Sequence, residues 1–191
     1  MNNALFALAI VVSLSACAKA PSSPPDKDPI VAALAHFQQQ PMWMPKSAEG
    51  QDHQVLVVKR QYEEISGMLS AGQLAMDVRP ESWVVPEDAR LDIERRGSEK
   101  PPFPDLPFPA YVRLVDDLGR FGLFEDSELF ERHPDARACL ELWPPGFTAD
   151  GRHALVCFMF GPTSHGAKAV YLLELRDGLW HVQHHRLAYY A

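Results

Sequence analysis

The sequence predicts an α+β fold in which N-terminal helices pack on an antiparallel β-meander. Apolar residues recur at helical spacing in the first half of the chain, whereas the last third consists of short apolar segments separated by turn residues. The Asp177-Gly178 dipeptide between the last two segments is a strong hairpin signal, because both turn residues need a positive φ angle.

The composition limits the classes of function. The 191 residues are 47% hydrophobic and 23% charged, which fits one globular domain with short appendages. The net charge of -7 argues against a broad nucleic-acid-binding face, which would need clustered Lys and Arg. Three cysteines are too few for a disulfide scaffold. We therefore expect no nucleic-acid partner, and the sequence indicates no cofactor.

The first 17 residues have the pattern of a cleaved export signal. Residues 4–14 form an apolar run that matches a signal-peptide core of about 7–15 residues and is shorter than the roughly 20 of a membrane-spanning helix. The Leu-Ser-Ala-Cys motif that ends at Cys17 resembles the lipobox of bacterial lipoproteins. The resemblance implies cleavage before Cys17 and lipid attachment to its sulfur. An ordinary secretory signal or a buried strand is the alternative.

A lipid attached at Cys17 would fix the organisation of the chain and its location. Two or more acyl chains, palmitate among them, anchor a protein stably in a bilayer. We expect the domain to face the periplasm or the exterior from the cell membrane or outer membrane, with an envelope protein as partner. The segments are a signal peptide at 1–16, a Pro-rich tether at 17–29 and one globular domain at 30–191.

Within the domain, residues 30–100 are predicted to be helix-rich. Ile30, Ala33, Leu34 and Phe37 follow the i, i+3, i+4, i+7 spacing of an amphipathic helix over about 29–40, started by Asp28 and Pro29. Further helices are predicted over 61–74, over 87–96, and over 127–133 in the second half of the chain. The helix at 87–96 is mostly polar and is expected to be buried through Leu91 and Ile93.

Residues 101–109 form a Pro-rich connection to the sheet-rich part at 110–191. Five prolines in residues 100–109 force an extended backbone. We expect Phe103 and Phe108 to pack on the domain. The alternative is a PxxP ligand for a Pro-binding domain.

The strands follow from short β-branched and alternating segments. They are predicted at 54–58, 111–114, 138–143, 154–160, 169–175 and 179–187. With Asp177-Gly178 as the turn, Leu175 faces Trp180, Leu173 faces Val182 and Tyr171 faces His184.

Cys139 and Cys157 are a candidate disulfide in an oxidising compartment. A hairpin centred on Thr148 would place them directly opposite each other, at a Cα separation of about 4.5 Å if the pair is not hydrogen-bonded. The alternative is two buried thiols that pack as small hydrophobic groups.

The loop from Gly161 to Gly166 is the candidate ligand site, with Ser164, His165 and Gly166 as its residues. It lacks the lysine position and following helix of a phosphate-binding loop, and Ser164 is not in a nucleophile elbow. A structural hairpin connection is the alternative. No metal site is predicted, since His184 and His185 point to opposite faces of a strand. A loop site with His153, His165 and a carboxylate stays an alternative.

Residues 144–156, 161–167 and 171–182 together resemble a C-terminal module of uncharacterised bacterial envelope proteins. The resemblance implies no activity and no catalytic residues. The ending Asp-Gly-x-Trp-x-Val at 177–182 is also similar to the last hairpin of cystatin-like and NTF2-like folds. We therefore expect a non-enzymatic binding or interaction module. An enzymatic role stays open as the weaker alternative, a periplasmic hydrolase or metal-dependent enzyme that uses the Gly161–Gly166 loop.

Overall fold

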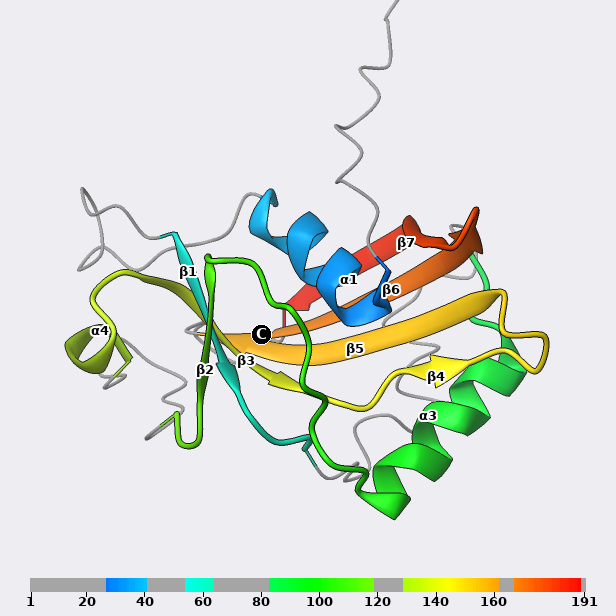
Figure 1. The fold of residues 1–191 in the computed structure, drawn as a ribbon, viewed down its shortest axis with the longest axis horizontal. Coiled ribbons are helices and arrows are strands. Elements are labelled where there is room, and N and C mark those ends of the chain that lie inside the picture. Colours follow the sequence, from blue (N-terminus) through cyan, green and yellow to red (C-terminus); the bar gives the residue numbers. More distant parts are fainter. Residues whose placement is uncertain (1–26, 41–53, 64–82, 119–128, 162–166, 190–191) are drawn as a thin grey trace, which may run out of the picture.

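The computed structural model describes residues 27–40, 54–63, 83–118, 129–161 and 167–189. The elements are α1 (Pro29–Gln38), β1 (Val55–Lys59), α3 (Glu87–Glu99), β2 (Val112–Val115), α4 (Leu129–Arg132), β3 (Ala136–Leu142), β4 (Gly146–Phe147), β5 (His153–Gly161), β6 (Ala167–Arg176) and β7 (Leu179–Tyr189). The strands form one sheet in the order β2-β1-β3-β5-β6-β7, and β4 pairs with β5 (Figure 1). Helices and a sheet together agree with the predicted α+β class.

The sheet is mixed, whereas the prediction was antiparallel throughout. Strands β3, β5, β6 and β7 form the expected antiparallel meander. Strand β1 instead pairs in parallel with both β2 and β3, because long connections separate it from each of them along the chain. Its three central residues are buried, which fits the unbroken apolar run typical of parallel strands.

Helix α1 covers one face of the antiparallel strands. Asp28 begins the helix as predicted, since its carboxylate accepts the backbone N–H of Ile30 at 2.8 Å and Pro29 occupies the first turn. Phe37 packs edge-on against Phe158 and Phe160 of β5. Every residue from Pro29 to Phe37 is buried, so the helix is enclosed on all sides and not along one stripe alone.

The Pro-rich connection packs against the same core cluster as α1. The contacts come from Phe103, Leu106 and Phe108, and Phe103 lies 5.1 Å from the ring of Tyr62. The prediction that Phe103 and Phe108 pack on the domain is thus confirmed. The alternative, an exposed ligand for a Pro-binding domain, would require these rings to leave the core.

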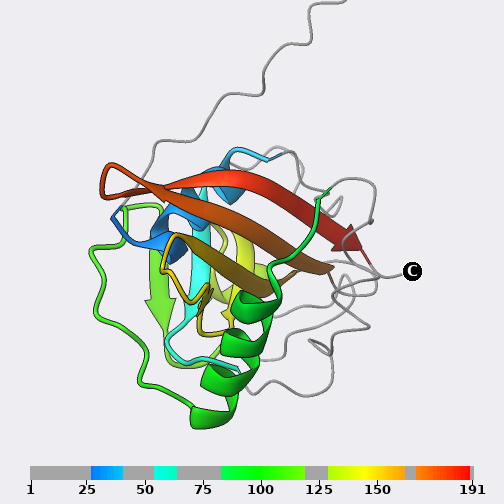
Figure 2. The same ribbon diagram turned by 90° about the vertical axis from the view of Figure 1, so that its right-hand side faces the viewer.

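Helix α3 packs on the opposite face of the sheet. Along β5, Ala154, Val156 and Phe158 belong to the core under α1, whereas Leu155 and Cys157 alternate with them and pack near α3. Figure 2 shows the curvature of the strands that these helices follow.

The residues that α3 buries differ from those predicted. Ala89, Ile93 and Gly97 are buried, at spacings of four residues, whereas Leu91 is 51% exposed. Leu91 was therefore wrongly placed in the core. The reason is that Leu91 lies two residues from both Ala89 and Ile93, which places it on the side of the helix that faces away from the sheet.

The predicted β6–β7 register is confirmed near the turn and fails beyond a bulge. Asp177 and Gly178 have positive φ angles of 53° and 76°, and Leu175 faces Trp180 and Leu173 faces Val182 as expected. The register then shifts between Leu172 and Leu173, so Tyr171 faces His185 and not His184. The extra residue lies in β7.

The shift changes which histidines share a face of β7. It turns the ring of His185 toward Tyr171 and α1. Uninterrupted alternation would place His181 and His185 on the same face of β7, since they are four residues apart. In the structure His181 faces Glu174 and His185 faces Tyr171, so the two histidines lie on opposite faces.

The predicted opposition of Cys139 and Cys157 is wrong. Cys139 lies opposite Gly161, and Cys157 lies opposite Val170. Both cysteines are buried with free thiols, which corresponds to the alternative of two packed hydrophobic groups. The hairpin is not centred on Thr148, because Pro144 and Pro145 interrupt the strand and the short β4 pairs with β5 separately.

Other predicted elements are present with shifted ends. The strand predicted at 111–114 is β2, and the short helix at 127–133 is found as α4. The helix predicted at 61–74 lies largely outside the described residues.

We predict that both thiols are unreactive in the native protein. Burial raises the pKa of the Cys139 thiol to about 12, so the nucleophilic thiolate is scarce at pH 8. Iodoacetamide should leave the native protein unmodified at both positions and should alkylate both in denaturant without reductant. Alkylation that appears only after a reductant is added would contradict the prediction of free thiols.

Candidate functional site

Several predicted site residues lie outside the described part of the chain. Cys17 and the loop residues Ser164, His165 and Gly166 are among them. The structure shows only what flanks the loop: Phe160 of β5 pairs with Ala167 of β6.

In the described ranges, the histidines do not come together with Asp, Glu or Cys side chains to form a metal site. Within these ranges, no group of three His, Cys, Asp or Glu side chains could hold an ion. His184 instead stacks on Trp83 with ring centroids 5.5 Å apart. His153 begins β5, where it faces Glu174 of β6.

A candidate interaction surface is built around α3 and the turn between β4 and β5. The helix carries a ladder of ion pairs at i, i+3 and i, i+4 spacing, which stabilises exposed helices. The pairs are Arg90 with Glu87 and Glu94, Arg95 with Asp92 and Glu99, and Arg96 with Asp92. These contacts occupy most of the charged groups along the helix.

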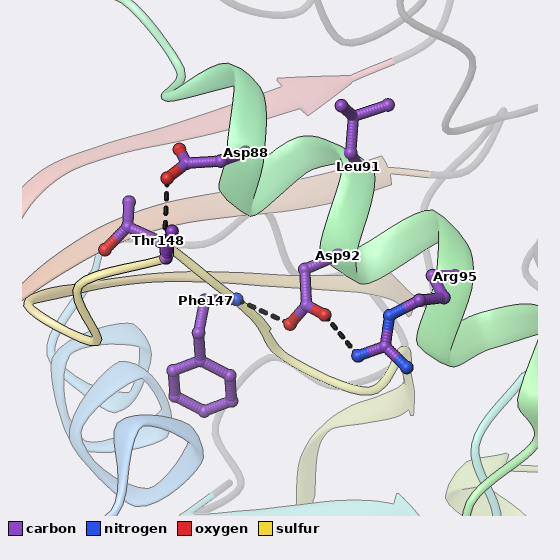
Figure 3. Close-up of a pocket in the computed structure, with 7 residues that line it drawn as sticks. Asp88, Leu91, Asp92, Arg95, Phe147 and Thr148 are labelled. Atoms are coloured by element: carbon purple, nitrogen blue, oxygen red, sulfur yellow. Dashed lines mark hydrogen bonds and ion pairs between the residues drawn. The ribbon is translucent and has the colours of Figure 1, made fainter.

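Two carboxylates of α3 fasten the helix to the β4–β5 turn. Asp92 accepts the backbone N–H of Phe147 at 2.9 Å, and Asp88 accepts that of Ala149 at 2.8 Å (Figure 3). Since Asp88 and Asp92 are one helical turn apart, they point the same way and meet successive donors of an extended segment.

Gly146 allows this approach. A Cβ atom at Gly146 would lie 2.2 Å from the carbonyl oxygen of Ala89 and 2.6 Å from the amide nitrogen of Ile93. Both distances are too short for any side chain, so only glycine fits between the helix backbone and the sheet. The turn itself is held by the Thr148 hydroxyl, which donates to Asp150 at 2.6 Å.

A shallow, open depression of about 390 Å³ lies between the helix and the turn (Figure 3). Its lining residues are Asp88, Leu91, Asp92, Arg95, Phe147, Thr148 and Ala149. We call these seven residues the α3 surface. Its apolar part comes from the half-exposed Leu91 and from Phe147, whose ring also has the guanidinium of Arg96 at 5.0 Å.

Asp92 is unsuited to acid–base catalysis near neutral pH. Burial raises the pKa of Asp92, but the N–H of Phe147 and the guanidinium groups of Arg95 and Arg96 outweigh it, so the pKa lies below its ordinary value. A general base works best with a pKa near the working pH. Asp92 is therefore an anchoring group, and the α3 surface offers shape, apolar contact and fixed charge.

Comparison with protein families, with curated proteins and with solved structures finds no match to this chain.

Sequence reasoning missed the α3 surface. One pattern in the sequence could have indicated it. Asp88 and Asp92 each directly precede a buried residue of α3, Ala89 and Ile93, and Gly97 continues the same helix face. The partner of that face, Gly146, lies more than 40 residues further along the chain, in a Pro-Pro-Gly segment that looks like an ordinary turn.

We predict that Gly146→Ala detaches α3 from the sheet. The added methyl group overlaps backbone atoms that cannot move aside, so we expect a loss of about 1–3 kcal/mol in the free energy of unfolding. Urea denaturation measures the loss, and hydrogen exchange of α3 amides locates it. The matched control is Gly151→Ala, where the Cβ meets nothing within 4 Å and only the positive φ angle of 67° causes strain. Equal exchange of α3 in both variants would refute the close-approach argument.

A second prediction concerns Asp92. Asp92→Ala leaves the N–H of Phe147 without its acceptor and should destabilise the protein by about 1–3 kcal/mol, whereas Asp92→Asn retains an acceptor oxygen and should cost less. The folded pKa is lowered, so the stabilisation by Asp92 is complete above the unfolded value of about 3.9 and is lost as the pH falls through the folded value. Urea denaturation from pH 6 to pH 2 should show a smaller acid loss in Asp92→Asn than in the original protein.

Proposed function

We propose that this chain is a lipid-anchored protein of the bacterial cell envelope and acts there as a non-enzymatic interaction module. The α3 surface is the site at which it binds a protein partner of the envelope. The observation that carries the proposal is Leu91, an apolar residue 51% exposed at a depression whose polar groups already have partners.

The chemistry of the α3 surface suits a protein partner. Asp88, Asp92 and Arg95 are held by backbone donors or by each other, so binding there does not have to desolvate an unpaired charge. An apolar side chain of the partner would cover Leu91. The charged ends of the helix would form the polar rim that protein interfaces commonly have.

The anchor is proposed from the sequence of residues 1–17. None of the described helices combines the length and the apolar character that a bilayer crossing requires. Lipid on Cys17 and a tether up to Pro29 would place α1 as the first folded element above the membrane.

We also propose a relationship to cystatin-like or NTF2-like folds. Support comes from α1, which lies across the antiparallel strands β5, β6 and β7 and fills the concave side of a curved sheet (Figure 2). The parallel strand β1 is an addition to that arrangement.

The anchor and the binding face are tested separately in intact cells. Radiolabelled palmitate should label the protein, and Cys17→Ser should abolish both the label and retention in the membrane fraction. Unchanged labelling of Cys17→Ser would refute lipidation.

For the binding face, a photo-crosslinking amino acid replaces Leu91, and the matched control replaces Glu131, which is exposed on α4 at the other end of the sheet (Figure 1). We expect a discrete crosslinked protein from position 91 that the control does not give. Crosslinking of equal strength at both positions, or at neither, would refute the α3 surface as the binding site.

A further inference from the structure

The rings of His36 and His185 meet where α1 crosses β7. Their centroids are 4.3 Å apart, and the ring of His185 also stacks on Tyr171 at 5.6 Å. His36 lies edge-on to the same tyrosine, with centroids 5.6 Å apart. The contact therefore joins the last turn of α1 to two neighbouring strands.

His36 is the buried member of the pair. Its exposed fraction is 7%, and it is one of two buried polar or charged residues recorded among the described residues. His185 is exposed to solvent on its outer side. Its ring reaches His36 only because of the bulge in β7, since uninterrupted pairing would place His184 opposite Tyr171.

The groups around His36 do not compensate a positive charge. Just after the end of α1, the side-chain amide of Gln40 lies 3.2 Å from Nδ1 of His36. The phenol of Tyr171 comes from β6, and the guanidinium of Arg137 from β3 binds the carbonyl oxygen of Gln40. Within the described residues no carboxylate pairs with either imidazole, and His185 is the charged neighbour that acts on His36.

Protonation of this contact opposes the docking of α1. Burial, and secondarily His185, lowers the pKa of His36 to about 4, although the C-terminal end of a helix ordinarily favours a protonated histidine. When α1 leaves the sheet, His36 regains a pKa of about 6.5. The undocked state therefore binds more protons between pH 6.5 and pH 4, and acid favours it in that window.

We propose that the His36–His185 contact is a pH-sensitive latch, which holds α1 on the sheet at neutral pH and releases it in mild acid. Because α1 is the first described helix after residues 17–29, its release lengthens the segment between the proposed anchor and the sheet. The latch itself requires only the folded domain. It can therefore be tested whether or not Cys17 carries lipid.

Hydrogen exchange of residues 30–38 is the test, measured at pH 7.5 and pH 5.0 on the mature chain in buffer with a metal chelator. Rates are divided by the intrinsic exchange rate at each pH. With the two pKa values above, one proton makes the opening of α1 about 30-fold more favourable at pH 5.0 than at pH 7.5. Protection of α1 should fall by that factor, whereas α3 keeps its protection because Asp92 titrates at lower pH.

Variants separate the latch from general acid instability. His36→Phe keeps a ring and should remove the pH dependence of α1 protection. His185→Gln changes an exposed residue and should reduce the dependence, because the neighbouring charge is lost. His181→Gln, on the other face of β7, is the matched control and should behave as the original protein. The latch is refuted if α1 protection is the same at both pH values, or if His185→Gln and His181→Gln have the same pH dependence.

Discussion

The close approach of α3 to β4 at Gly146 is the constraint on which the packing of one face of the sheet depends. Because no Cβ fits there, the helix lies directly on the strand backbone, and Asp88 and Asp92 come within hydrogen-bonding distance of the β4–β5 turn. Ala89, Ile93 and Gly97 form the contact face of the helix, and Leu91 lies on its outer face. Leu91 is therefore exposed beside the turn that Asp88 and Asp92 hold, and it supplies an apolar part of the α3 surface.

The helices on the two faces of the sheet are held there by different interactions. Helix α1 is apolar and enclosed, and aromatic contacts from Phe37 hold it on β5. Helix α3 is highly charged and is held by backbone-directed carboxylates and a narrow apolar seam. Titration therefore affects the helices differently. The docking of α3 depends on the ionised carboxylate of Asp92, whereas that of α1 depends on the neutral imidazoles of His36 and His185.

The features that could be predicted from the sequence are those set by residues close together in the chain. Local signals were sufficient for α1, where Asp28 and Pro29 start the helix, and for the Asp177-Gly178 turn. Strand positions also agreed, since they depend on short apolar runs. The parallel pairing of β1 could not be predicted, because local patterns do not state which distant strand lies beside it.

Errors of register had the same origin. The opposition of Cys139 and Cys157 assumed an uninterrupted hairpin, whereas Pro144 and Pro145 separate β3 from β4. The bulge in β7 likewise has no glycine or proline to indicate it. The α3 surface was missed because it depends on Gly146, whose distant partner is a helix backbone without a sequence pattern of its own.

The bulge in β7 has a consequence for contacts between copies of this chain. Strand β7 is the last in the order of described strands, and a long regular edge strand invites pairing with another chain. The irregular stretch with the exposed residues Gln183, His184 and His185 interrupts that edge near its middle. The same irregularity that brings His185 to α1 thus protects neighbouring copies from joining edge to edge into aggregates.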